Sequence, residues 1–282
     1  MSNRIKLVSD STCDLSQDLI QKYDIDIVPL YVNFEEESFF DGVNLTTPEM
    51  YKMVKERGIL PKTAAASPGS FYETFLKYTT QGIDVIYIGL GSKFSATYQA
   101  AHTAKSMIEE GNVFLIDSQN LSSGSGLLLL KAAKFREEGM NGEQITHAIE
   151  QIVGKVRSQF VIDTLEYLYK GGRLNALSTV MGTMLRIKPI IKVRDGVMAV
   201  GKKGRGSLKN GIDLMLQEVL TQEEDIDLDF CMITHSMSDD YTDYIKSSVK
   251  EIPFKNVFVT NAGCVISSHC GKGTIGILYI LK

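Results

Sequence analysis

The feature that most constrains this fold is the alternation, along the first half of the chain, of short apolar runs with segments of helical periodicity. The apolar runs predict strands at residues 5–8, 25–32, 84–88 and 113–116. The helical spacing of apolar residues predicts helices at residues 15–23, 48–55, 70–78, 95–109 and 123–137. A strand–helix–strand rhythm is typical of a mostly parallel sheet with helices on both faces. We therefore predict an α/β fold for this half of the chain.

Three loops of this predicted sheet carry polar side chains. The sequences SDSTCD, GLGSKFS and DSQN follow the strands at 5–8, 84–88 and 113–116, and each supplies hydroxyl, carboxylate or amide groups. Ligands of parallel sheets bind at the carboxyl ends of the strands. The three loops are therefore candidate parts of one binding site.

The segment 84–105 is the most informative of these, because it reads as a buried strand that turns through Gly89 and Gly91 into a helix. Ser95 is placed to cap that helix. Free N–H groups at a helix start, together with the helix dipole, favour a carboxylate or phosphate. The alternative is an ordinary turn whose N–H groups are satisfied by Ser95 itself or by water. Both interpretations are open on this segment alone.

The second half of the chain has a different rhythm. Asp195 and Gly196, flanked by β-favouring residues, predict a hairpin. Further strands are predicted at 229–234, 256–260 and 273–281, and helices at 143–156, 208–220 and 239–249. A chain of 282 residues exceeds the size at which one core usually divides. We predict two domains, an α/β domain at residues 1–155 that carries the three polar loops and an α+β domain at residues 156–282 that contributes the rest of the binding pocket.

Composition argues against several classes of function. A formal net charge of -4 and a pI near 5.7 provide no general basic field for nucleic acid. No apolar run approaches the roughly 18 residues that span a bilayer, and the start of the chain shows no secretory pattern. We expect a cytoplasmic protein without stable membrane insertion.

The four cysteines are then expected to be reduced. Cys264, His269 and Cys270, with Cys13 brought in by the fold, offer ligands for zinc. However, no C-x-x-C pair is present, and adjacent side chains aim poorly at one metal. Buried thiols are the favoured interpretation, and we expect neither a metal nor a cofactor.

Three local patterns resemble known phosphate-binding, nucleotide-binding or nucleophilic sites. Residues 196–203 nearly match the phosphate-binding loop, but Lys203 replaces its hydroxyl residue and the segment reads as a hairpin arm. Residues 271–276 match G-x-G-x-x-G, yet a strand rather than a helix follows. Ser9, Asp10, Ser11 and His269 remain a candidate nucleophilic site for a stand-alone hydrolase or phosphotransferase.

A set of motifs, in order over essentially the whole chain, resembles the DegV family. The motifs are VSDSTCD, PKT followed by SPGSF, SKFSATYQAA, VFLIDS, LEYLYKGGR, the pair Lys188 and Pro189, GKKGRGSLK and SSHCGKGTIGI. The resemblance implies two α/β-type domains with a long-chain fatty acid held between or within them. Some members of the family are the fatty-acid-binding subunit of bacterial fatty acid kinase, and the resemblance implies the same role for this chain. Such a protein is a non-catalytic carrier that presents the carboxylate to a separate ATP-dependent subunit for acyl phosphate formation.

The resemblance assigns roles to individual residues. Thr63 in PKT, Ser95 in SKFSATY and His269 in SSHCGKG match the groups that hold the carboxylate. The loop around the head group would include Ser11, Ala96 and Thr97. Arg173 in LYKGGR and Arg205 in GKKGRG match arginines implicated in docking the kinase or lying at the rim of the site. The chain departs from the family at Ala64–Ala65–Ala66, at Ala96 and at Lys272.

Physical chemistry agrees with a fatty-acid carrier. Each buried methylene contributes about 0.8 kcal/mol, so most of the affinity must come from an apolar tunnel. Two hydroxyls, helix N-terminal amides and one histidine suffice for the carboxylate. Met181, Met184, Leu185 and Ile187 are expected to line the core or the tunnel. The rival functions are the stand-alone enzyme and a lipid sensor without a kinase partner.

Overall fold

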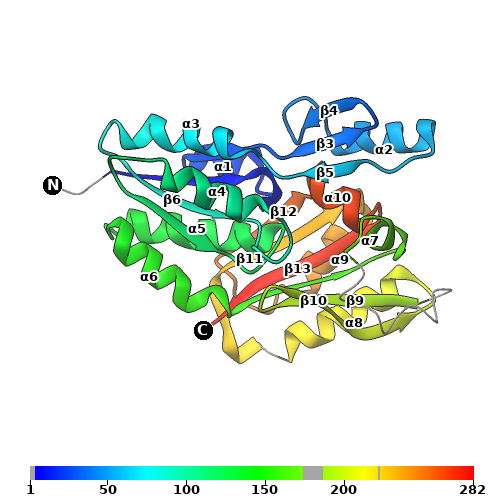
Figure 1. Cartoon of the computed structure of the whole chain (residues 1–282). Helices are drawn as coiled ribbons and strands as arrows, with labels where there is room; N and C mark the ends of the chain where they lie inside the picture. Colours follow the sequence, from blue (N-terminus) through cyan, green and yellow to red (C-terminus); the bar gives the residue numbers. More distant parts are fainter. Residues whose placement is uncertain (1–3, 174–186, 222) are drawn as a thin grey trace.

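The computed structural model describes residues 4–173, 187–221 and 223–282. The first part of the chain forms a parallel sheet of four strands (Figure 1). Its strand order is β2-β1-β6-β7, and every neighbouring pair is parallel. The strands are β1 Ile5–Asp10, β2 Ile25–Val28, β6 Asp84–Gly89 and β7 Val113–Asp117. Helices α3 (Pro68–Thr79) and α4 (Thr97–Ser106) cover one face, and α5 (Ser123–Glu137) and α6 (Gly142–Val153) cover the other. The predicted α/β fold with helices on both faces is confirmed.

The prediction of one strand over 25–32 is wrong. The parallel strand β2 ends at Val28, because Pro29 has no N–H to continue the ladder. The chain then enters β3 (Tyr31–Phe34), which belongs to a separate antiparallel sheet with order β4-β3-β5. Strands β4 (Glu37–Phe40) and β5 (Lys62–Ala64) are too short to show a period in the sequence. This small sheet is nevertheless what carries Thr63.

The predicted helices of the first half are all present, with ends shifted by a few residues. Ser16 caps α1 (Gln17–Lys22), Thr46 precedes α2 (Thr47–Arg57), and Ser67 caps α3. One cap was predicted wrongly, because Ala96 rather than Ser95 immediately precedes α4. The Ser95 side chain still accepts a hydrogen bond from the Thr97 N–H at 3.2 Å.

The second half forms a six-stranded mixed sheet with order β10-β9-β8-β13-β11-β12. The Asp195–Gly196 hairpin is confirmed, since both residues have positive φ, 51° and 73°, between antiparallel strands. The predicted strands 229–234, 256–260 and 273–281 are present in longer or slightly shifted form. The strands are β8 Val156–Val161, β9 Ile187–Arg194, β10 Val197–Arg205, β11 Ile226–Ser236, β12 Asn256–Asn261 and β13 Thr274–Leu281.

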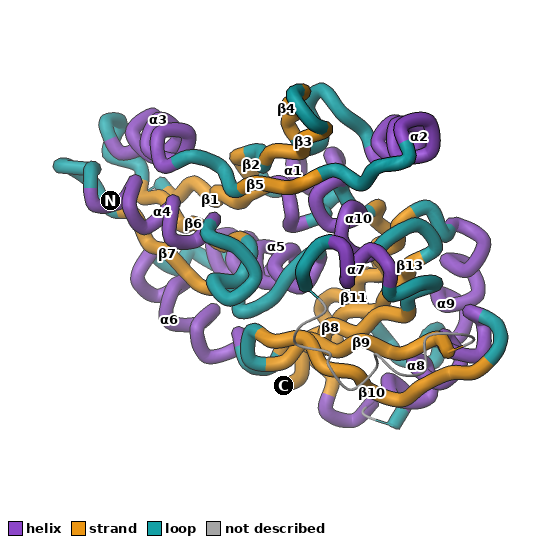
Figure 2. Tube along the Cα trace, turned by 45° about the vertical axis from the view of Figure 1, so that its right-hand side comes forward, coloured by secondary structure: helices purple, strands orange, loops and turns teal. Residues whose placement is uncertain are grey.

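Helices α8 (Leu208–Leu220) and α9 (Thr242–Ser248) pack on this sheet. Two short helices escaped sequence prediction, α7 (Glu166–Lys170) and α10 (Cys264–Cys270). Both views place α10 between the three-stranded sheet and the six-stranded sheet, with α7 beside it (Figure 2). All strands of the first two sheets precede residue 156, and all strands of the third follow residue 155. The division into domains at 155/156 stays a prediction.

Helix α5 lies between the parallel sheet and the six-stranded sheet and packs against both. Every residue from Ser123 to Ala133 is buried, which explains why this helix is apolar around its whole circumference. One hydrophobic cluster therefore runs from β1 and β6, through α5, to β11 and β13. No described helix combines the length and apolarity that a membrane span requires. All four cysteines are buried with free thiols, as predicted.

Lys131 is the one charged residue in the buried part of α5, and it forms ion pairs with the six-stranded sheet. Its Nζ lies 2.6 Å from Asp227 and 2.7 Å from Asp229, which also accepts from Lys134 at 2.5 Å and Lys255 at 2.7 Å. Partial burial alone would raise the pKa of Asp229, but these three lysines outweigh it and hold that pKa well below its ordinary value.

Because the folded state lowers the pKa of Asp229, the cluster stabilises the fold at pH values above about 4, the unfolded value of an aspartate. That stability is lost as the pH falls through the folded pKa. We expect Asp229→Asn to lower the free energy of unfolding by about 1–2 kcal/mol at pH 7, and the difference from wild type to shrink below pH 4. Urea unfolding of both proteins between pH 7 and pH 2 measures this. A difference independent of pH would contradict it.

Candidate functional site

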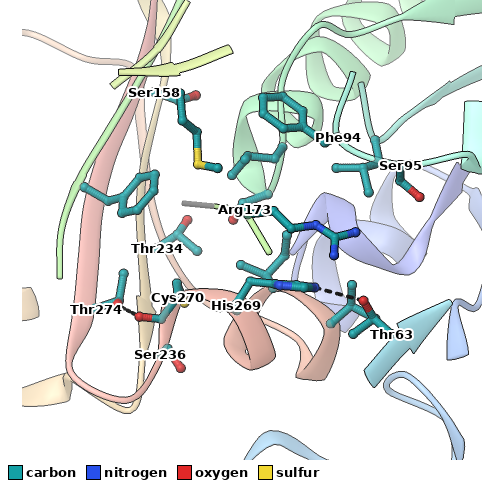
Figure 3. Close-up of a pocket in the computed structure, with 18 of the residues that line it drawn as sticks. Thr63, Phe94, Ser95, Ser158, Arg173, Thr234, Ser236, His269, Cys270 and Thr274 are labelled. Atoms are coloured by element: carbon teal, nitrogen blue, oxygen red, sulfur yellow. Dashed lines mark hydrogen bonds between the residues drawn. The ribbon is translucent and has the colours of Figure 1, made fainter. Parts of the chain in front are cut away.

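The candidate site is a cavity of about 300 Å³ between the carboxyl edge of the parallel sheet and the inner face of the six-stranded sheet (Figure 3). Its size lies at the lower end of the range of small-molecule sites. Most of its lining is apolar. The apolar residues are Leu30, Ala64, Ala65, Leu90, Phe94, Ala96, Leu121, Phe160, Leu168, Met198, Ala262, Val265, Ile266, Gly276 and Leu278.

The wall from the parallel sheet is formed by the loops that follow β6 and β7, as the polar sequences predicted. Gly91 donates its N–H to the Asn120 carbonyl at 2.8 Å, which joins the two loops. A Cβ at Gly91 would lie 2.8 Å from the Asn120 nitrogen, so only glycine allows this approach. The contact places Leu90, Phe94 and Ser95 on one side of the cavity beside Leu121.

Thr63 and His269 form the polar centre of the cavity. They are 206 residues apart in the sequence, yet Thr63 Oγ1 lies 2.8 Å from His269 Nε2 (Figure 3). Thr63 comes from β5 and His269 from the last turn of α10. The structure therefore brings together two of the residues that were predicted for the head-group site, whose role toward a ligand stays a prediction.

The His269 imidazole is neutral at pH 7. Burial, together with the neighbouring Arg173 cation, lowers the pKa of His269 to about 4. Its Nδ1 is buried without a hydrogen-bond partner and packs against Gly171. When the proton is on Nε2, His269 donates to Thr63 Oγ1, which leaves the Thr63 hydroxyl proton free to be donated into the cavity.

Ser95 and Ala96 also line the cavity. The Ser95 Oγ lies 2.8 Å from Thr97 Oγ1 and accepts the Thr97 N–H at 3.2 Å. Of the two interpretations that the sequence left open, satisfaction of this N–H by Ser95 itself is therefore observed. The Ser95 hydroxyl keeps hydrogen-bonding capacity toward a ligand.

Arg173 supplies the one positive charge among the described residues that line the cavity. It is exposed, and its Nη1 donates to the Gly171 carbonyl at 2.7 Å. In Figure 3 its guanidinium extends toward the side of the cavity where Thr63 and His269 lie.

Three of the residues proposed for the site do not line the cavity. Ser11 donates its hydroxyl to Asp41 at 2.9 Å and accepts the Leu30 N–H at 3.1 Å, so its Oγ is already occupied. Thr97 is completely buried at the start of α4. Arg205 is exposed at the end of β10, where its carbonyl accepts a hydrogen bond from the Asn210 side-chain amide. The expectations for Met181, Met184 and Leu185 lie outside the described residues.

The alternative nucleophilic site is not assembled. Ser9 is completely buried and donates to the Ile88 carbonyl at 2.7 Å. Asp10 accepts from Tyr87, from the Leu90 N–H and from Thr12. Because His269 bonds Thr63 instead, these residues form no serine–histidine pair.

The sequence predicted that the second half contributes to the site but did not identify the residues with which the six-stranded sheet lines the cavity. Every second residue of a strand faces the same side, so β8, β11 and β13 together present a row of small, hydroxyl and apolar side chains to the cavity. These residues are Ser158, Phe160, Thr234, Ser236, Thr274, Gly276 and Leu278. The alternation was legible in the sequence, but the order of the strands in the sheet was not.

The chain is similar to known proteins over nearly its whole length. A family model described as an uncharacterised protein of the DegV family matches residues 4–282. A DegV domain-containing protein of Clostridium acetobutylicum is 37% identical over 283 residues, with 99% of each chain covered.

Two solved structures resemble the fold of this chain over nearly its whole length. A fatty-acid-binding DegV family protein from Thermus thermophilus has a TM-score of 0.93 at 29% identity, covering 99% of this chain and 100% of its own. A stearic-acid-binding protein from Eubacterium ventriosum has a TM-score of 0.88 at 27% identity, covering 99% of this chain and 98% of its own.

Gly171 provides a test of how tightly the imidazole is held. A Cβ at this position would lie 2.3 Å from His269 Nδ1, so we expect Gly171→Ala to displace the ring, break its bond to Thr63 and cost about 1–3 kcal/mol of stability. Gly154→Ala is the matched control, because an added Cβ there meets nothing within 4 Å and its φ is −68°. Chemical unfolding and the NMR signals of the His269 ring are the measurements. Equal behaviour of the two variants would show that the ring is not confined.

Proposed function

Because this chain belongs to the DegV family, we propose that it binds one long-chain fatty acid in the cavity between its two larger sheets. The observation that carries the proposal is an apolar cavity with the Thr63–His269 pair in its wall. The fatty-acid-binding proteins to which the fold is similar support the same ligand class.

The apolar wall would hold the alkyl chain. Phe160, Met198 and Leu278 approach the cavity from β8, β10 and β13, and Phe94 approaches it from the loop after β6. Each methylene removed from water contributes about 0.8 kcal/mol, so the tail supplies most of the affinity. Met198 can adapt its unbranched side chain to the shape of the tail.

The head group would be bound mainly by neutral donors. Thr63 and Ser95 can each donate a hydrogen bond to a carboxylate, His269 keeps the Thr63 hydroxyl proton available by donating its own N–H to Thr63 Oγ1, and Arg173 adds a positive charge at the same side. A neutral imidazole is suited to this role because burying a permanent cation would cost more than it returns. Thr97 and Ser11 would act indirectly, through their hydrogen bonds to Ser95 and Asp41.

We further propose that the protein is the carrier subunit of a fatty acid kinase system in the cytoplasm and has no catalytic activity of its own. The fatty-acid carboxylate would be presented to an ATP-dependent partner, which forms the acyl phosphate. Arg173 supports this, because it is both exposed and part of the cavity lining, so a partner that contacts it would be near the head group. Arg205 would extend the docking surface along β10.

Native mass spectrometry of the purified protein tests the binding proposal. We expect one fatty acid per chain, and we expect Thr63→Val and Ser95→Ala each to weaken its retention by about tenfold, the value of one lost charge-assisted hydrogen bond. Thr103→Val is the control, since Thr103 is exposed on α4 and bonds only its own helix. An empty protein that hydrolyses ester or phosphoester substrates by itself would overturn the proposal.

The docking proposal is tested with the kinase subunit and ATP. We expect Arg173→Ala and Arg205→Ala to reduce acyl phosphate formation by tenfold or more because they remove charges that orient the partner. Lys105→Ala removes an exposed cation from the far end of α4 and should have no effect. Lipid content is measured in parallel, because loss of lipid in Arg173→Ala would assign this residue to the head group. A wild-type protein that holds lipid but yields no acyl phosphate would instead be a sensor.

A further inference from the structure

The short helix α10 holds His269 in place, and its own sequence provides no side-chain cap for its first turn. The helix spans seven residues and is preceded by Gly263, which has no side chain to accept the free N–H groups. These N–H groups must find acceptors elsewhere because Cys264 and Val265 are buried.

Two carboxylates from distant parts of the chain supply these acceptors. Asp14 Oδ1 accepts the Gly263 N–H at 2.8 Å, and Asp41 Oδ1 accepts the Cys264 N–H at 2.7 Å. Asp14 belongs to the SDSTCD loop after β1, and Asp41 follows β4. Neither residue lines the cavity, and the proposed function mentions Asp41 only as the hydrogen-bond partner of Ser11.

The second oxygen of each carboxylate is also fixed by a hydroxyl. Asp14 accepts from Ser122, and Asp41 Oδ2 accepts from Ser11 at 2.9 Å. The two aspartates are 4% and 2% exposed. They therefore connect the loop after β1, the end of β4 and the loop before α5 to the start of α10.

Gly263 fits between the two carboxylates with little space to spare. A Cβ on this residue would lie 3.0 and 3.1 Å from the oxygens of Asp41 and 3.4 Å from Asp14 Oδ1. The absence of a side chain at residue 263 thus allows both carboxylates to reach the backbone.

This arrangement is costly, because burial raises the pKa of both Asp14 and Asp41, and their mutual repulsion adds to the shift for Asp14. Apolar residues or a single capping serine could close the same space more cheaply. The carboxylates instead fix the position of a helix of fewer than two turns, and that helix presents His269 to Thr63 across the molecule.

We propose that Asp14 and Asp41 are positioning residues for the head-group site, holding α10 by its amino end so that His269 Nε2 stays within hydrogen-bond distance of Thr63. The proposal rests on the proposed function for its ligand but not for its geometry. Thr47 Oγ1, which donates to the Ala262 carbonyl at 2.8 Å, assists from α2. Loss of either carboxylate would let α10 shift or rotate and carry the imidazole with it.

The experiment uses the full chain, with histidine labelled in the ring and palmitate labelled with ¹³C at the carboxyl carbon. We expect Asp41→Ala to shift the His269 ring signals in the ligand-free protein, to shift the palmitate carboxyl signal toward its position in His269→Ala, and to weaken palmitate binding by about tenfold. Asp41→Asn keeps one acceptor oxygen and should restore most of each property. Asp14→Ala and Asp14→Asn should form a parallel pair.

Gly263→Ala provides an independent variant that removes no buried carboxylate, so it covers the case in which Asp41→Ala does not fold. We expect it to move the same signals, because the added methyl group presses on Asp41. Asp229→Asn is the control, since it breaks a different connection between α5 and β11 without contacting α10. It should lower stability and leave the His269 and carboxyl signals unchanged.

The outcomes distinguish failure of the positioning role from failure of the proposed function. If Asp41→Ala and Gly263→Ala lower stability as Asp229→Asn does, but the His269 signals stay at the wild-type positions, the positioning role is wrong. If wild-type protein binds no palmitate, the proposed function fails, and the His269 signals of the ligand-free variants still decide whether the aspartates position the ring.

Discussion

The burial of α5 between two sheets is the constraint on which the rest of the structure depends. Its leucines at 127–130 are completely buried and join the two sheets into one hydrophobic cluster. Its first turn contains only small residues, and a Cβ at Gly124 would overlap Asn120 and Ser158. The two sheets therefore approach closely where α5 begins. The cavity lies just beyond this point, where Leu121 and Ser122 line it.

Burying a charged group in such an apolar interior costs free energy, and this cost determines which polar groups surround the cavity. Among the described residues that line the cavity, His269 is the one histidine that forms a hydrogen bond with a hydroxyl. Burial keeps its ring neutral. Three buried aspartates of the first half, Asp10, Asp14 and Asp41, lie near the site and accept hydrogen bonds from backbone N–H groups and hydroxyls. The SDSTCD loop thus serves as a framework behind the site, whereas its sequence suggested direct contact with a ligand.

The differences between prediction and structure have identifiable causes. The strand predicted at 25–32 divides because Pro29 interrupts the ladder, and a signal for that break was present in the sequence. The strands β4 and β5 and the helices α7 and α10 are too short for periodicity to reveal, yet β5 and α10 carry Thr63 and His269. Arg205 matched a family motif, but its place on β10 keeps it out of the cavity lining.

The sequence by itself determined the α/β class, most of the longer helices, the Asp195–Gly196 hairpin and the identity of Thr63, Ser95 and His269 as candidates. The fold class, the helices and the hairpin follow from local periodicity and turn chemistry, which are properties of neighbouring residues, whereas the three candidate residues follow from the resemblance to the DegV family. Only the tertiary structure decided that Thr63 and His269 meet at 2.8 Å, that Ser158, Thr234 and Leu278 face the same space, and that Asp14 and Asp41 hold α10. Such contacts join residues far apart in the chain, up to 249 positions for Asp14 and Gly263, and no local pattern encodes the order in which strands pair or the face on which a distant helix packs.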